Sequence, residues 1–287
     1  MTELKQYHLH KNDYSQLHFE VQDAAPYCAK NAEHCFRAHR HSFYQLLWFK
    51  EPGTHYVDYE VIEHPANALF FLNQGQVHYF CKQASNEGRL FHFNDLFLQR
   101  HNGHQNDWIQ YNLFNEIGTP YVVLPEKELN EVSMLCELLE AELNGRSENY
   151  RLQVYHLFQT LLLKVNRLKR DQGVSDEKVD QNFVQVMAFK KLVKQHLQAT
   201  LTISEYAQQL GISTKKLTLL SKRYLHKPPS TFIHESKVLE AKRLLSNLSL
   251  SIKEVGFSLG FEQATYFTKY FKKHTGLTPK EFVKRLP

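Results

Sequence analysis

Two stretches in the last third of the sequence carry polar side chains suited to reading the edges of DNA bases. Lysine donates to guanine, glutamine forms two hydrogen bonds with adenine, and the methyl groups of alanine and threonine contact the thymine methyl. The candidates for base contacts are Thr214, Lys215, Lys216, Thr218, Gln263, Ala264, Thr265, Thr268 and Lys269. Cations further along each stretch are predicted to contact phosphates. They are Lys222, Arg223, Lys272 and Lys273.

Both stretches lie within a helix-turn-helix pattern that the sequence repeats. The residues that recur 49 or 50 positions later are Ile203, Glu205, Leu210, Gly211, Thr218, Lys222, Pro229 and Phe232, and Leu217 has Phe267 as its counterpart. Gly211 and Gly260 mark the turns, where a residue with positive φ is needed. The pattern predicts two units, 203–224 and 252–274, whose second helices start near the base-contact residues. One amphipathic helix over 230–246, about 25 Å long at 1.5 Å per residue, is expected to connect them.

Basic residues are concentrated in the same part of the chain. Of the 35 basic and 30 acidic residues, 18 basic and 6 acidic ones lie between positions 183 and 287, a net charge of +12. The other 17 basic and 24 acidic residues give the preceding part a net charge of −7. This asymmetry favours a polyanion as the partner of the C-terminal part.

The N-terminal part has a different pattern. Short aromatic and β-branched runs, separated by Gly, Pro and Asn, predict closely turned strands in a barrel or jelly roll. Two amphipathic helices and a polar stretch follow. The sequence therefore predicts a two-domain α+β chain. Its expected parts are a β-barrel over 1–125, a helical hairpin over 126–168, a linker over 169–184 and an all-α domain over 185–287. No apolar run approaches the ~20 residues of a membrane span, and the polar start does not resemble an export signal.

The second repeat resembles the signature of the AraC/XylS family of bacterial transcription regulators. The residues that carry the resemblance are Gly260, Phe261, Tyr266, Phe267, Phe271, Gly276, Pro279 and Phe282. The likeness extends over residues 185–285. The first repeat departs from the family pattern at Ser221, His226 and Lys237, where an aromatic residue, a glycine and an arginine are usual.

Two segments of the N-terminal part resemble the motifs of cupin barrels, a sensing domain common in this family. In metal-binding cupins the motif positions hold three histidines and a glutamate; here they hold His39, His41, Gln45 and His78. Because glutamine replaces the carboxylate, the resemblance implies an effector pocket with no metal and no other cofactor. We assign Trp48 to the same pocket. The alternative is a metal site on the three histidines, since converging imidazoles hold Zn, Fe or Ni.

The resemblance implies a cytoplasmic regulator without enzymatic activity. It would bind double-stranded promoter DNA as a homodimer through the helical hairpin, contact RNA polymerase, and respond to a small molecule in the barrel, as an activator more often than a repressor. One alternative is a cupin metalloenzyme, such as a dioxygenase or isomerase, with an appended DNA-binding domain. This alternative predicts that the purified protein contains bound metal in stoichiometric amount and turns over a substrate. Another is a purely architectural DNA binder, which predicts no small-molecule response.

Overall fold

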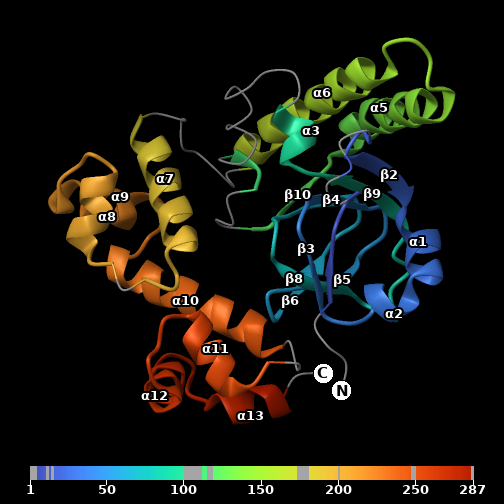
Figure 1. Ribbon diagram of the computed structural model, residues 1–287. Helices are drawn as coiled ribbons and strands as arrows, with labels where there is room; N and C mark the ends of the chain where they lie inside the picture. The colour runs from blue at the N-terminus through green and yellow to red at the C-terminus, as the bar shows by residue number, and fades with distance from the viewer. Residues whose placement is uncertain are drawn as a thin grey trace. The chain divides into compact units, whose positions relative to one another are not determined.

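The computed structural model divides the chain into two compact units, Lys5–Asp176 and Glu177–Pro287 (Figure 1). It describes residues 5–10, 13, 16–99, 112–114, 119–172, 181–199, 201–246 and 250–285. Within these ranges, the first unit combines strands with helices and the second contains helices only. The predicted α+β class is therefore confirmed. None of the described helices is long and apolar enough to span a membrane.

Two five-stranded sheets face each other in the first unit. The first sheet has the order β1-β3-β8-β5-β6, with strands at Lys5–Tyr7, His39–His41, Val77–Phe80, Gly53–Val57 and Glu60–His64. The second has the order β10-β7-β4-β9-β2, with strands at Tyr121–Val123, Ala68–Leu72, Tyr44–Phe49, Gly88–Phe93 and Phe19–Asp23. No described strand hydrogen-bonds into both sheets, so of the predicted barrel or jelly roll the unit has the two-sheet arrangement and is not closed.

The alternation of side chains along β4 builds a three-layer unit. Leu46 and Trp48 face the helices α5 (Glu126–Gly145) and α6 (Tyr150–Asp171) and share a core with them. Leu47 and Phe49 face the other way, into the core between the two sheets. Since β4 is covered on both faces, all six of its residues are buried and it has no polar stripe for solvent. Three shorter helices, α1 (Ala24–Lys30), α2 (Ala32–Cys35) and α3 (Asp95–Gln99), lie between strands in the chain.

Helix α6 continues beyond the predicted end of the hairpin. Lys169 is only 1% exposed. Its Nζ donates to the carbonyl oxygen of Asn112 at 2.9 Å and lies 5.3 Å from the centre of the Phe71 ring. The polar stretch that begins at Lys169 predicts a linker, but the aliphatic stem of this lysine continues the buried face of α6. The predicted linker 169–184 thus overlaps the end of α6 and the start of α7, and residues 173–180 lie outside the described residues.

The second unit contains the repeated pattern as two helix-turn-helix pairs. Its described helices are α7 (Gln181–Gln195), α8 (Ile203–Gln209), α9 (Thr214–Tyr224), α10 (Pro229–Leu245), α11 (Ile252–Ser258), α12 (Ala264–Thr275) and α13 (Pro279–Lys284). The inward positions of α9 and α12, led by Leu217 and Phe267, are buried as the repeat predicts. Helix α10 packs on both α9 and α12, and Figure 1 shows it running between the two pairs.

Candidate functional site

The first turn of α9 presents most of the candidates for base contacts in the first pair. Thr214, Lys215 and Lys216 are all exposed. Ser213 precedes them as the N-cap, and its Oγ accepts a hydrogen bond from the Lys216 backbone N–H at 3.1 Å. This cap determines where α9 begins and so places the two lysines at its N-terminal end.

The corresponding end of α12 is built differently. Gln263 is the N-cap residue, with an extended backbone, and its side chain does not cap the helix. Its side-chain amide is exposed and makes only a 3.5 Å contact with the Thr265 hydroxyl. Ala264 and Thr265 follow in the first turn, and Lys269 is exposed one turn later.

Two threonines among the candidates for base contacts use their hydroxyl groups in hydrogen bonds within their own helix. The Thr218 hydroxyl donates to the carbonyl oxygen of Thr214, and the Thr268 hydroxyl donates to that of Ala264, both at 2.9 Å. Both side chains are half-buried. Only their methyl groups and oxygen lone pairs remain for a ligand, so the lysines and Gln263 are the stronger candidates.

The predicted phosphate contacts lie in the last turns of the same helices. They are Lys222 and Arg223 on α9, and Lys272 and Lys273 on α12, and all four are exposed. A helix that enters the major groove with its N-terminal end places such flanking cations near the backbone.

The structure adds two exposed residues that the sequence analysis did not select. Tyr266 is 58% exposed on α12 and Leu219 is 60% exposed on α9. At the offset of 50, Tyr266 corresponds to Lys216 and Leu219 corresponds to Lys269. Comparison of the two repeats would therefore have identified Tyr266 and Leu219, because each occupies the position of a selected residue in the other repeat.

The N-terminal candidates gather between the two sheets. The side chains of His39, His41 and His78 are each at most 5% exposed, and their potential ligand atoms all lie within 4.8 Å of one another. Strand pairing explains the gathering, since His39 is directly opposite His78 in the β3–β8 ladder. His41 is two residues along the same strand and so faces the same side.

Hydrogen bonds hold these rings in place. His41 Nε2 lies 2.8 Å from His78 Nε2, and His78 Nδ1 lies 3.2 Å from His55 Nε2. His39 Nδ1 lies 2.8 Å from the carbonyl oxygen of Arg37, to which it donates as the only available donor of the pair. Burial lowers the pKa of His39 to about 4 and holds the pKa of His41 and His78 well below the usual range. All three rings are therefore neutral near pH 7.

Gln45 and Trp48, the other two residues assigned to the effector pocket, lie on opposite faces of β4. Gln45 is buried between the sheets, and its Nε2 is 2.7 Å from His92 Nε2. Trp48 packs in the core beneath the helices instead, so its assignment to the pocket is wrong. The sequence analysis also did not select His92, although it is 2% exposed and its ring lies 6.2 Å from that of His41. His92 could have been selected only from the pairing of β9 with β4, which places it opposite Gln45.

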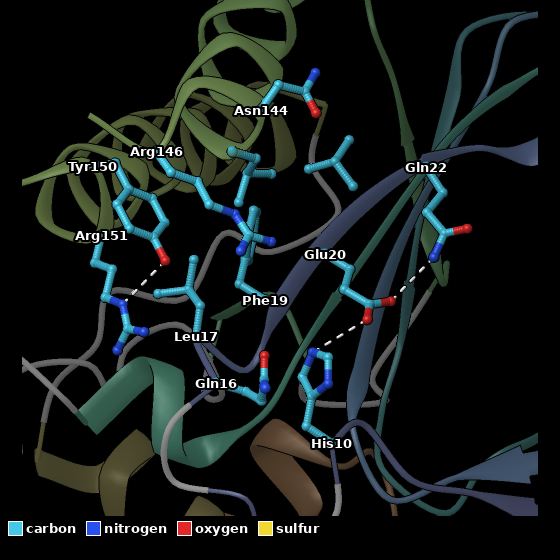
Figure 2. A pocket seen from close by; sticks show the side chains of 12 residues that line it. His10, Gln16, Leu17, Phe19, Glu20, Gln22, Asn144, Arg146, Tyr150 and Arg151 are labelled. Atoms are coloured by element: carbon cyan, nitrogen blue, oxygen red, sulfur yellow. Dashed lines mark hydrogen bonds and ion pairs between the residues drawn. The ribbon is translucent and has the colours of Figure 1, made fainter.

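An open cavity of the first unit lies elsewhere, beside β2 and the turn between α5 and α6 (Figure 2). Its volume is about 480 Å³, within the ~300–1,000 Å³ typical of small-molecule sites. The polar residues that line it are His10, Gln16, Glu20, Gln22, Asn144, Arg146, Tyr150 and Arg151. Leu17, Phe19, Val21 and Leu143 give it an apolar wall.

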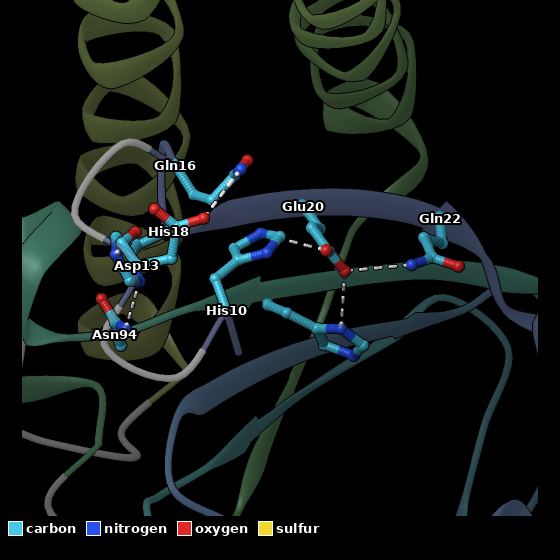
Figure 3. A network of polar contacts seen from close by, with 8 residues as sticks. His10, Asp13, Gln16, His18, Glu20, Gln22 and Asn94 are labelled. Atoms are coloured by element: carbon cyan, nitrogen blue, oxygen red, sulfur yellow. Dashed lines mark hydrogen bonds and ion pairs between the residues drawn. The ribbon is translucent and has the colours of Figure 1, made fainter. Parts of the chain in front are cut away.

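Glu20 connects this cavity with the buried histidines (Figure 3). One carboxylate oxygen lies 3.2 Å from His10 Nε2, and the other accepts from Gln22 Nε2 at 3.1 Å. The second oxygen also faces His92 Nδ1 at 3.8 Å. The interaction with His92 is the largest cause of the lowered pKa of Glu20. His92 thus contacts Glu20 through Nδ1 and Gln45 through Nε2.

Comparison with known proteins shows that the C-terminal unit is similar to helix-turn-helix domains. Residues 206–285 match the family model described as a helix-turn-helix domain. The HTH-type transcriptional regulator ArgR of Pseudomonas aeruginosa is 31% identical over 90 residues, which are 31% of this chain and 27% of that protein. The arabinose operon regulatory protein of Escherichia coli is 34% identical over 80 residues, which are 28% of this chain and 27% of that protein.

A third relative aligns with most of the chain. The uncharacterized HTH-type transcriptional regulator YfiF of Bacillus subtilis is 24% identical over 254 residues, which are 85% of this chain and 77% of that protein. The matches to ArgR and to the arabinose regulator span less than a third of the length of either relative.

Proposed function

We propose that the chain is a sequence-specific DNA-binding regulator of transcription of the AraC/XylS family, and its similarity to helix-turn-helix regulators supports this. The observation that carries the proposal is the pair of recognition helices, α9 and α12. Each begins with exposed side chains that bond base edges and ends with exposed cations. The net charge of +12 over residues 183–287 supports a polyanionic partner.

Genome-wide footprinting of the bound promoters tests this function directly. We expect discrete sites with two half-sites about one helical turn, ~34 Å, apart, because two recognition helices of one chain read successive major grooves. The Gln263→Ala variant should relax the preference at one base position of the second half-site. Binding without sequence preference across the genome would contradict the proposal and favour an architectural DNA binder.

We further infer that a small-molecule effector controls DNA binding from the first unit. The cavity of Figure 2 supports this, since it has the size of a small-molecule site and adjoins the turn of the α5–α6 hairpin. Arg146 and Arg151 suit a carboxylate, and the wall formed by Leu17 and Phe19 suits an apolar body. A thermal-shift screen with organic acids, sugars and metabolites tests this, with Arg146→Ala expected to abolish the response to an acid that binds.

The same resemblance supports action as a homodimer in the cytoplasm that contacts RNA polymerase, with activation the more common outcome in this family. The exposed apolar side chains Met134 and Leu138 lie one turn apart on α5 and suit a second copy of the chain. We infer that the protein is not an enzyme, and the names of ArgR, YfiF and the arabinose operon regulatory protein, all regulators, support this. Turnover of a substrate by the metal-loaded protein would instead favour the cupin metalloenzyme.

A further inference from the structure

The buried histidines between the sheets are arranged as ligands of one ion. His41 Nε2 and His78 Nε2 lie 2.8 Å apart, and the ligand atom of His39 is within 4.8 Å of both. In a tetrahedral zinc site with Zn–N distances of about 2.0–2.1 Å, two nitrogens lie about 3.3 Å apart. Small shifts of the rings would therefore bring all three nitrogens to bonding distance of a common ion.

In two of the three rings, the nitrogen that would not bind the ion makes a hydrogen bond that orients the ring. His39 Nδ1 donates to the Arg37 carbonyl, and His78 Nδ1 is bonded to His55 Nε2. A histidine that binds a metal generally uses its second nitrogen in this way, which fixes the tautomer and the direction of the lone pair. The first bond places the proton of His39 on Nδ1 and so leaves the lone pair of Nε2 for a metal ion.

Gln45 adds an oxygen donor to the same buried layer. Its Oε1 is buried and has no hydrogen-bond partner within the part of the chain that the structure describes. Its Nε2 contacts His92, whose ring stacks 6.2 Å from His41. Leaving a buried carbonyl oxygen unpaired costs about 1–3 kcal/mol, so a positively charged partner for this oxygen would remove that cost.

We propose that His39, His41 and His78 bind one divalent transition-metal ion between the two sheets, with Gln45 Oε1 beside it as the oxygen donor. Imidazole ligands suit zinc, iron, nickel and copper, whereas magnesium and calcium prefer oxygen ligands. The site departs from our expectation of a pocket without metal, which rested on the replacement of a glutamate by Gln45. Three neutral imidazoles suffice to hold such an ion, and the lost carboxylate changes only its charge and its fourth ligand.

Cobalt binding by the full chain tests the site. The protein is prepared without a histidine tag, its metal content is measured, and it is then dialysed against a chelator and titrated with Co²⁺. We expect one ion per chain, visible d–d absorption of a Co²⁺ site with nitrogen ligands, and a higher thermal unfolding midpoint with Zn²⁺. His41→Gln and, separately, His39→Gln should weaken binding by ~100-fold or more. His55→Phe should weaken it 10- to 100-fold, as for loss of a partner that orients a ligand.

His64→Gln is the matched control. His64 is a buried histidine of the same sheet, but its Nδ1 lies 3.1 Å from the Pro65 carbonyl and its ring stacks on Phe49, away from the three ligands. It should bind Co²⁺ as the wild type does. Absence of a d–d spectrum in the wild type, or equal affinity in both ligand variants that fold by circular dichroism, would overturn the site. Because DNA affinity is measured separately, such a result would leave the proposed regulatory function standing.

Discussion

Gly211 and Gly260 end the first helix of each helix-turn-helix pair, yet their surroundings differ. Both have positive φ, 65° and 81°. A Cβ on Gly260 would lie 1.8 Å from the carbonyl oxygen of Gln198, whereas a Cβ on Gly211 would meet nothing within 4 Å. The turn of the second pair is therefore packed against the segment that follows α7, and that of the first pair is open.

Substitution of the two glycines should separate these effects. Gly211→Ala should lower the free energy of unfolding by about 1 kcal/mol, the cost of a left-handed backbone for a residue with Cβ. Gly260→Ala should cost ~3 kcal/mol or more, because overpacking adds to that strain. Chemical denaturation of both variants gives the comparison. Equal losses would show that the contact with Gln198 does not constrain the turn.

Lys272 should contribute to DNA binding through charge alone. We expect Lys272→Ala to weaken binding to all sequences alike and to reduce the slope of log K against log salt by about one unit, since one phosphate contact is lost. Anisotropy titrations over a salt series measure this slope. Lys82→Ala is the control, because it removes the same charge from an exposed residue of the other unit. An unchanged slope for Lys272→Ala would rule out its phosphate contact.

The end of α9 shows how an element accommodates residues that depart from its family pattern. Ser221, where an aromatic residue is usual, is fully buried and donates its hydroxyl to the Lys227 carbonyl at 2.7 Å. His226, where a glycine is usual, adopts a φ of 55°. The first pair thus closes its turn by a hydrogen bond, whereas the second has Phe271 packed on Phe282 and Gly276 in the turn.

Exchanging the turn residues should move stability in opposite directions. His226→Gly should raise the free energy of unfolding by about 0.5–1 kcal/mol, because glycine adopts positive φ without steric cost. Gly276→His should lower it by a similar amount, since the φ of Gly276 is 77° and a Cβ there would meet nothing within 4 Å. Thermal denaturation tests both. A loss of stability in His226→Gly would mean that the imidazole makes a contribution larger than the backbone strain.

Capping boxes begin α8, α11 and α13, and they should give the C-terminal unit an acid-dependent stability. Hydrogen bonds from the backbone of Thr202, Ser251 and Thr278 lower the pKa of Glu205, Glu254 and Glu281. A carboxylate whose pKa is lower in the folded state contributes stability above its unfolded pKa, near 4.3, and this stability is lost as the pH falls through the folded value.

Glu254→Gln should weaken this acid dependence. Glutamine can still accept the backbone bond of a capping box but takes up no proton. The variant should therefore lose less stability than the wild type between pH 5 and pH 3 in urea denaturation. If the free energy of unfolding of the variant fell as steeply with decreasing pH as that of the wild type, the Glu254 carboxylate would not be linked to folding.

At the scale of the whole molecule, the exposed face of α5 should determine the oligomeric state. Met134 and Leu138 are 61% and 46% exposed although they belong to a helix whose other face is a core. Met134→Lys with Leu138→Lys should shift the protein from dimer to monomer in sedimentation velocity. Val61→Lys, an equally exposed apolar residue on β6, should leave the dimer intact. A wild type that sediments as a monomer at micromolar concentration would contradict the dimer.

Local signals predicted the C-terminal unit better than the N-terminal one. The glycines, caps and apolar spacing that define each helix lie within about twenty residues, and a second copy of the pattern supports each assignment. The sheets instead depend on pairings such as Gln45 with His92, which join distant strands. The resemblance to cupin motifs therefore pointed to His39, His41 and His78, but Trp48 was assigned with them and His92 was not selected.

The sequence by itself determined that this chain has a basic, helical part with two unequal copies of a helix-turn-helix motif, because helix periodicity and turn glycines are local properties. Only the tertiary structure decided which polar side chains meet. It arranged the expected barrel or jelly roll as two facing sheets, buried Lys169 at the end of α6, and separated an open cavity from a cluster of buried histidines. These contacts depend on which strands pair and on which face of the sheet each side chain lies. Neither is encoded within a single stretch of chain.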